Sequence, residues 1–208
     1  MLKPITKGRA DKMKTIVYTH PYSGSFNHAI LTRLTDYFES EGQDYQVIDL
    51  YQDGFDPRYS AEELRLFSRG ETPYQLVKDY QRMIERSNEL IVITPIWWYN
   101  IPAELKGFFD KVMLRGFAYV ESPEWRGLLT YINKATVITT STVPKDYLQQ
   151  QAGDPIQGNL INRTIADLGI DPSKTNWIHF GEVNLTTDKV RKQFLADLPN
   201  LYRDGKQS

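Results

Sequence analysis

The segment His20–Asn27 carries polar residues suited to bind an anion. An apolar, β-branched run precedes it and an amphipathic run, residues 28–41, follows it, which predicts a strand, a short polar loop and a helix. Ser25 and Asn27 stand where a helix N-cap is expected. Because a helix N-terminus carries unpaired N–H groups and partial positive charge, we predict that a phosphate binds here. The alternative is a strand–loop–helix unit that binds nothing, since the loop is neither GxGxxG nor a Walker motif.

The segment Pro95–Asn100 places three aromatic residues in a row, Trp97, Trp98 and Tyr99. Core packing beneath a loop is the simplest interpretation of a single aromatic residue. Neighbouring side chains diverge, however, so three consecutive rings cannot all enter one core. We predict that some of them line a pocket for a flat heteroaromatic ligand or contribute to a dimer interface.

The segment Thr139–Thr142 offers four consecutive hydroxyl groups, which could bind the polar edge of such a ring. The alternative is that threonine favours strands and serine favours turns. Tyr147 follows in the polar segment Ser141–Asp154, which we predict to be a loop. Its phenol could donate a hydrogen bond at the same site; the alternative is a wall or lid residue.

The predicted strands alternate with helices along the chain, which is typical of a doubly wound α/β domain with helices on both faces of a parallel sheet. Five strands favour the flavodoxin-like order 2-1-3-4-5. Its crevice opens at the carboxyl ends of the first and third strands, so His20–Asn27 and Pro95–Pro102 are expected to face each other. The predicted strands lie around Ile16–Val17 and at Asp44–Leu50, Glu89–Thr94, Ala135–Thr140 and Asn176–Phe180.

Composition narrows the possible functions. The chain has 208 residues, enough for one domain, which we place at residues 14–208 after a polar, basic N-terminal arm at residues 1–13. The net charge of −1 gives no basic face for nucleic acid. The absence of cysteine excludes disulfides and thiolate metal sites, and the three histidines lack metal-ligand spacing. No run is long enough for membrane insertion, and we expect a cytoplasmic protein.

Three motifs together resemble the NAD(P)H:quinone oxidoreductase family of the DT-diaphorase type, which has a flavodoxin-like fold. The resemblance spans the chain from Lys14 to the final helix. The motifs are His20-Pro-x-x-x-Ser25-Phe26-Asn27, then Pro95-x-x-Trp98-Tyr99-x-x-Pro102-Ala103-x-Leu105-Lys106-Gly107-x-x-Asp110, then Gly116-Phe117-Ala118-Tyr119.

The resemblance implies a role for each motif. A flavin, FMN or FAD, would place its phosphate on His20, Ser25, Phe26 and Asn27. Its isoalloxazine ring would lie along Pro95, Ile96, Trp97, Trp98 and Tyr99. Thr139, Thr140, Ser141 and Thr142, with Tyr147 as the catalytic residue, would close the pyrimidine side. Phe117 and Tyr119 of a partner subunit would cover the substrate side in a homodimer with shared active sites.

The chain also departs from the pattern of the best-studied family members. Ser141–Thr142 stands where they carry a glycine pair. Gly153 stands six residues after Tyr147, where they carry a histidine, so a tyrosine–histidine relay is not expected. The chain is shorter than the mammalian members, so FMN fits at least as well as FAD.

The resemblance implies a two-electron reductase with ping-pong kinetics, which passes a hydride from NAD(P)H through the flavin to a quinone or a similar flat electrophile. Azo or nitro compounds would be alternative substrates of the same site. One alternative function is a one-electron carrier of the flavodoxin type, which usually needs a strongly acidic face. Another is a regulatory subunit of a potassium efflux system.

Overall fold

A computed structural model describes residues 13–121 and 123–204 of the chain. Its centre is a five-stranded parallel sheet in the order β2-β1-β3-β6-β7. Counting only these five strands, the order is 2-1-3-4-5, so the predicted doubly wound, flavodoxin-like topology is confirmed. The strands are β1 (Lys14–Tyr18), β2 (Tyr45–Asp49), β3 (Glu89–Pro95), β6 (Lys134–Thr140) and β7 (Thr175–Phe180).

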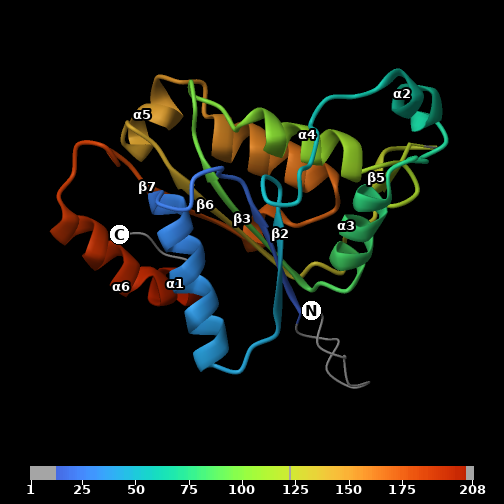
Figure 1. Cartoon of the computed structure of the whole chain (residues 1–208). Helices are drawn as coiled ribbons and strands as arrows, with labels where there is room; N and C mark the ends of the chain where they lie inside the picture. The colour runs from blue at the N-terminus through green and yellow to red at the C-terminus, as the bar shows by residue number, and fades with distance from the viewer. Residues whose placement is uncertain (1–12, 122, 205–208) are drawn as a thin grey trace.

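Helices cover both faces of the sheet (Figure 1). One face packs against α1 (Phe26–Ser40) and α6 (Asp188–Asp204), and the other against α3 (Gln75–Glu85), α4 (Ala103–Val112) and the π-helix η2 (Pro155–Ile165). Every residue of β3 is buried, because both faces of this central strand are covered. This explains why its sequence is a continuous apolar run rather than an alternating one.

Three short elements differ from the sequence-based prediction. The segment predicted as a loop over Ser141–Asp154 contains a short helix, α5 (Lys145–Gln150), which carries Tyr147. A two-stranded hairpin forms from β4 (Tyr119–Val120) and β5 (Arg126–Gly127). A 3₁₀ turn, η3 (Pro172–Lys174), precedes β7. A capping box at Ser60 opens α2 (Ala61–Phe67).

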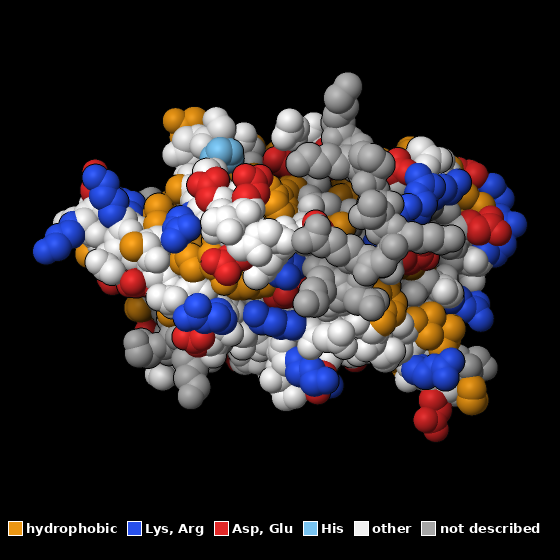
Figure 2. Space-filling view, turned by 90° about the horizontal axis from the view of Figure 1, so that it is seen from below, with side chains coloured by type: hydrophobic (Ala, Val, Ile, Leu, Met, Phe, Trp, Pro, Cys, Tyr) orange, Lys and Arg blue, Asp and Glu red, His pale blue; other side chains and the backbone are white. Residues whose placement is uncertain are grey.

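The expected N-terminal arm lies outside the described residues except for Met13. The Met13 carbonyl accepts a hydrogen bond from the N–H of Asn88 at 3.0 Å, so this residue is tied to the start of the sheet. Within residues 13–121 and 123–204, no helix is long and apolar enough to cross a membrane. Figure 2 shows the face below the sheet, where basic and acidic side chains are interspersed rather than gathered by sign.

Candidate functional site

The carboxyl ends of β1 and β3 meet at the upper edge of the sheet in Figure 1, where the doubly wound topology predicts a crevice. These strands are neighbours, and the chain winds away from them in opposite directions. The loops at residues 19–25, 96–102 and 141–144 all follow strands at this edge. The fold therefore brings together the three segments that the sequence singled out.

The N-terminus of α1 forms one wall of the crevice. Ser25 is the N-cap, and its Oγ accepts a hydrogen bond from the N–H of His28 at 3.1 Å. Asn27 is only 3% exposed, and its Nδ2 donates to Thr140 Oγ1 at 2.8 Å. Its Oδ1 and the hydroxyl of Thr19 are buried with no hydrogen-bond partner among the described residues. Buried polar atoms are normally paired, so these two groups fit a site that a polar ligand completes.

His20 stands beside this helix N-terminus as a neutral imidazole. Burial lowers its pKa below the ordinary value of 6.5. Its Nδ1 accepts a hydrogen bond from the N–H of Tyr22 at 3.1 Å, so in the neutral ring the proton resides on Nε2. The lowered pKa favours the neutral form. The ring meets Trp97 edge-on, with centroids 5.9 Å apart.

The aromatic segment forms a tight turn on the opposite side. Trp97 and Asn100 exchange two backbone hydrogen bonds, of 2.9 and 3.1 Å. Between them, Trp98 and Tyr99 have φ angles of 49° and 60°, as in a type I′ turn. Bulky residues rarely adopt positive φ, and such strain is concentrated at functional sites. The Trp98 side chain is 94% exposed, while Ile96 below it is buried, so the turn presents its rings outward.

The hydroxyl groups at the end of β6 and just after it do not all face the crevice. Thr139 Oγ1 accepts from Trp177 Nε1 and lies 2.7 Å from His179 Nδ1. Ser141 Oγ donates to the carbonyl of Val143 at 2.5 Å. These two side chains therefore hold β6 against β7 and the loop that follows. Thr140 faces α1 through Asn27, and Thr142 is exposed.

Tyr147 and Tyr99 meet across the mouth of the crevice. Their ring centroids are 5.9 Å apart and the rings are tilted by 33°. The nearby Tyr147 phenol raises the pKa of Tyr99. The sequence singled out both residues but gave no sign of their contact, which joins the turn after β3 to the helix after β6.

Phe117 and Tyr119 do not join this crevice within the same chain. They follow α4, which starts near the crevice and leads away from it; its ten residues span about 15 Å. Tyr119 is buried and stacks on Trp125, with centroids 4.2 Å apart and planes 11° apart. Their expected role toward a partner's site stays a prediction.

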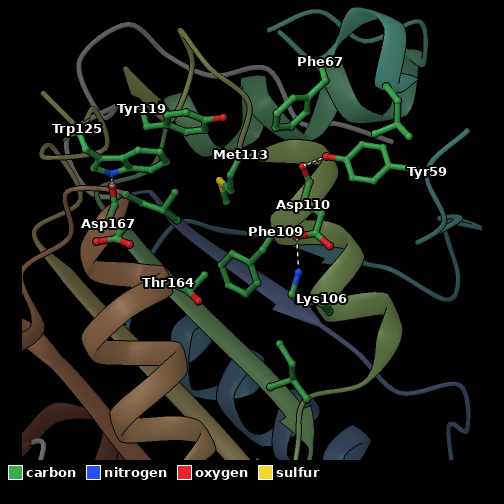
Figure 3. A pocket seen from close by; sticks show the side chains of 13 residues that line it. Tyr59, Phe67, Lys106, Phe109, Asp110, Met113, Tyr119, Trp125, Thr164 and Asp167 are labelled. Atoms are coloured by element: carbon green, nitrogen blue, oxygen red, sulfur yellow. Dashed lines mark hydrogen bonds and ion pairs between the residues drawn. The ribbon is translucent and has the colours of Figure 1, made fainter. Parts of the chain in front are cut away.

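A groove that the sequence did not predict lies along α4. It encloses about 420 Å³, and Figure 3 shows aromatic rings and Met113 facing it from several elements. The apolar residues Leu64 and Phe67, which are exposed on α2, were the signal in the sequence that could have indicated this groove. The lining comprises Tyr59, Leu64, Phe67, Ile101, Lys106, Phe109, Asp110, Met113, Tyr119, Trp125, Thr164, Asp167 and Leu168.

Comparison with known proteins identifies the family. The profile of a family described by its flavodoxin-like fold matches residues 13–198. A Haemophilus influenzae protein, named as an uncharacterized NAD(P)H oxidoreductase, is 30% identical over 182 residues, covering 86% of this chain and 89% of its own.

Solved structures agree with this relationship. An NAD(P)H:quinone oxidoreductase from Methanothermobacter marburgensis is 26% identical with a TM-score of 0.81, over 94% of this chain and 99% of its own. An FMN-dependent NADH-azoreductase from Bacillus anthracis, solved with FMN, is 16% identical with a TM-score of 0.72, over 94% of this chain and 100% of its own; at this identity it shows a shared fold. The resemblance found in the sequence is thus confirmed, and the chain belongs to the flavodoxin-like NAD(P)H:quinone oxidoreductase family.

Proposed function

We propose that this chain is a flavin-dependent NAD(P)H:quinone oxidoreductase that binds FMN in the crevice between β1 and β3. The observation that carries this proposal is the arrangement of the crevice walls. A capped helix N-terminus with an orphaned, buried Asn27 oxygen forms one wall, and an outward-facing aromatic turn forms the other. The first suits a phosphate and the second suits a flat ring.

The residues of the first wall would hold the phosphate end. The N–H groups of Phe26 and Asn27 lie in the first turn of α1, where no earlier helical carbonyl can accept them. The Ser25 cap orients that turn, and the Nε2–H of His20 adds a neutral donor. These uncharged N–H donors, together with the helix dipole, can bind a phosphate without a positively charged side chain.

The residues of the second wall would hold the ring. Pro95 and Ile96 are buried beneath it, and Trp97, Trp98 and Tyr99 rise from the turn. On the third side, the hydroxyls of Thr139 and Ser141 are already hydrogen-bonded to Trp177 of β7 and to the Val143 carbonyl. Thr140 and the exposed Thr142 are therefore better placed to contact a ligand. Bound FMN supplies the hydride chemistry that links NAD(P)H to a quinone.

The chain's own residues would supply binding, orientation and a proton. Tyr147 lies at the mouth of the crevice with a partly exposed phenol, so it can donate a proton to an acceptor oxygen. FMN is favoured over FAD because the fold neighbour from Bacillus anthracis was solved with FMN. As the cysteine-free sequence suggested, we place the protein in the cytoplasm.

We further propose that the protein acts as a homodimer. The groove along α4 exposes Leu64, Phe67 and Trp125, more apolar surface than one crevice requires. A second copy packed there would place Phe117 and Tyr119 near the other copy's crevice.

The experiment that tests the function is a visible absorbance spectrum of the purified protein, followed by anaerobic addition of NADH or NADPH. A yellow protein that bleaches in one two-electron step, and is reoxidised by a quinone, is the expected result. A stable one-electron species would instead point to a carrier. A protein that neither holds nor takes up FMN or FAD would refute the proposal, and co-purification with a membrane transporter would then favour the regulatory role.

A further inference from the structure

The loop at residues 141–144 joins β6 to α5 (Figure 1). Its first residue is fixed from behind by the end of β7 and the residues that follow. The N–H of Ser141 donates to the Phe180 carbonyl at 3.1 Å, and the Ser141 carbonyl accepts from the N–H of Val183 at 2.9 Å. Thr142 comes next and is exposed. The loop therefore has an anchored start and an open second residue.

His179 of β7 links this loop to the interior of the sheet. Trp177 Nε1 donates to Thr139 Oγ1 at 2.7 Å, and Thr139 Oγ1 lies 2.7 Å from His179 Nδ1. On the other side of the ring, His179 Nε2 lies 3.2 Å from both Ser141 Oγ and the Val143 carbonyl oxygen. Thr139, Ser141 and His179 are all buried. Hydrogen bonds therefore run without a break from Trp177 to the loop.

The partners of His179 decide which ring nitrogen carries the proton. A carbonyl oxygen can only accept, so the bond to Val143 requires a hydrogen on Nε2. Nδ1 of the neutral ring is then an acceptor, and the Thr139 hydroxyl donates to it. That hydroxyl keeps its hydrogen for this bond, because the indole N–H of Trp177 is a donor only. Burial lowers the pKa of His179 to about 4, so the ring is neutral at neutral pH.

Ser141 carries the constraint on to the next peptide groups. Its Oγ donates to the Val143 carbonyl at 2.5 Å and accepts from the Val143 N–H at 3.2 Å. Both polar backbone groups of Val143 are thus engaged by the interior of the protein. Among the described residues, nothing accepts the N–H of Thr142. The backbone N–H of this exposed residue is therefore available to a ligand.

We propose that His179 is a positioning residue for the cofactor site: through Ser141 and Val143 it holds the loop at residues 141–144 in the shape that offers Thr142 to the edge of the FMN ring. This inference rests on the proposed reductase function. Because His179 is buried behind the loop, it acts through the loop. A loop that is already ordered loses less conformational entropy when a ligand binds. The network should therefore increase FMN affinity.

Two substitutions separate the halves of the imidazole ring. The short carboxamide of H179N reaches the place of Nδ1 and keeps an acceptor for Thr139, but it falls short of the loop. The longer carboxamide of H179Q reaches the place of Nε2 and keeps a donor for the Val143 carbonyl. Titration of FMN fluorescence should show about tenfold weaker binding in H179N and a change of less than about twofold in H179Q. A role limited to packing β6 against β7 would weaken both variants alike.

The second test uses the wild-type protein, so it does not depend on how the variants fold. Nitrogen-15 NMR of the histidine rings without FMN should show His179 as the Nε2–H tautomer. In the backbone spectrum, the Val143 N–H should be protected from hydrogen exchange before FMN is added. Addition of FMN should then shift the resonance of the Thr142 N–H. A ring protonated on Nδ1 would overturn the inference, because its Nε2 has no hydrogen to donate to the loop.

The outcomes separate this inference from the proposed function. If the wild-type protein does not bind FMN, the proposed function is wrong and this inference falls with it. If the wild type binds FMN but H179N and H179Q bind it as tightly, His179 does not position the loop, and the proposed function stands. An unmoved Thr142 resonance on FMN binding leads to the same conclusion. A loss of affinity confined to H179N supports the positioning role.

Discussion

At the scale of single residues, His179 shows how burial makes stability depend on pH. Its Nδ1 lies 2.7 Å from Thr139 Oγ1, and its Nε2 lies 3.2 Å from the Val143 carbonyl. Burial lowers its pKa from the ordinary 6.5 to about 4. The neutral ring therefore links β7 to Thr139 of β6 and to Val143 in the loop after β6.

We predict that the free energy of unfolding falls as the pH drops from 6.5 toward 4. Between these pH values the unfolded chain binds a proton on His179 and the folded chain does not. The stabilising contribution of His179 is therefore fully present above the unfolded pKa of 6.5 and is lost as the pH falls toward the folded pKa of about 4. The slope from this group is about 1.4 kcal/mol per pH unit, or roughly 3 kcal/mol in total. Urea unfolding across this range measures it. The H179Q variant should lose this part of the slope, and an unchanged slope would contradict the assignment.

Ser25 offers a second residue-scale prediction. Ser25→Ala removes the side-chain acceptor for the His28 N–H and should lower the free energy of unfolding by about 1 kcal/mol. FMN affinity should fall as well, because the first turn of α1 frays. S40A is the matched control: it makes the same chemical change at the other end of α1, where Ser40 Oγ donates to the Tyr37 carbonyl. Fluorescence titration with FMN that ranked both variants equal would argue against the phosphate position.

At the scale of elements, the proposed site implies that the aromatic turn gives up stability for ligand contact. The Trp98 ring is almost fully exposed and its backbone is left-handed, so Trp98→Gly should raise the free energy of unfolding of the apo protein by about 1 kcal/mol while weakening FMN binding. L185G serves as control, since Leu185 is also exposed but its φ is not positive; glycine there should destabilise. A less stable W98G apo protein would show that the turn is not strained.

A buried ion pair joins α2 to α4. Lys111 Nζ lies 3.0 Å from Glu63 Oε1, both side chains are 4% exposed, and Nζ also donates to the carbonyls of Asp56 and Arg58. K111M or E63Q alone should each cost about 3 kcal/mol of unfolding free energy, because either leaves a buried charge without its counter-charge. The double variant should cost less than the sum. Additive losses in urea unfolding would mean that the pair is not coupled.

The elements also show what the sequence could predict. The alternation of strands with helices predicted the sheet and its order, and burial on both faces left a local signature in the apolar run of β3. The helix α5 has six residues and the strands of the β4–β5 hairpin have two each, too few for periodicity to appear. The contact of Asn27 with Thr140 joins positions 113 apart. Such pairs are made by tertiary packing and leave no local pattern.

At the scale of the whole molecule, the crevice and the α4 groove lie in different places on one chain. Tyr119 faces the groove, and about 15 Å of helix separates it from its own crevice. A two-fold pair that packs groove to groove is self-complementary. Such a pair would bring each Tyr119 toward the other copy's aromatic turn, so FMN binding would need one chain and quinone reduction would need two.

If FMN binding needs one chain and quinone reduction needs two, a substitution that breaks the dimer should impair quinone reduction and leave FMN binding intact. Leu64→Glu puts a charge on the exposed, groove-lining side of α2 and should convert a dimer to a monomer in sedimentation equilibrium at micromolar concentration. FMN should stay bound, because the phosphate and ring walls belong to one chain, while quinone reduction should fall. L185E, at another exposed leucine outside the groove lining, should remain dimeric and active. A wild-type monomer at that concentration, or an L64E monomer with full activity, would show that each chain carries a complete site.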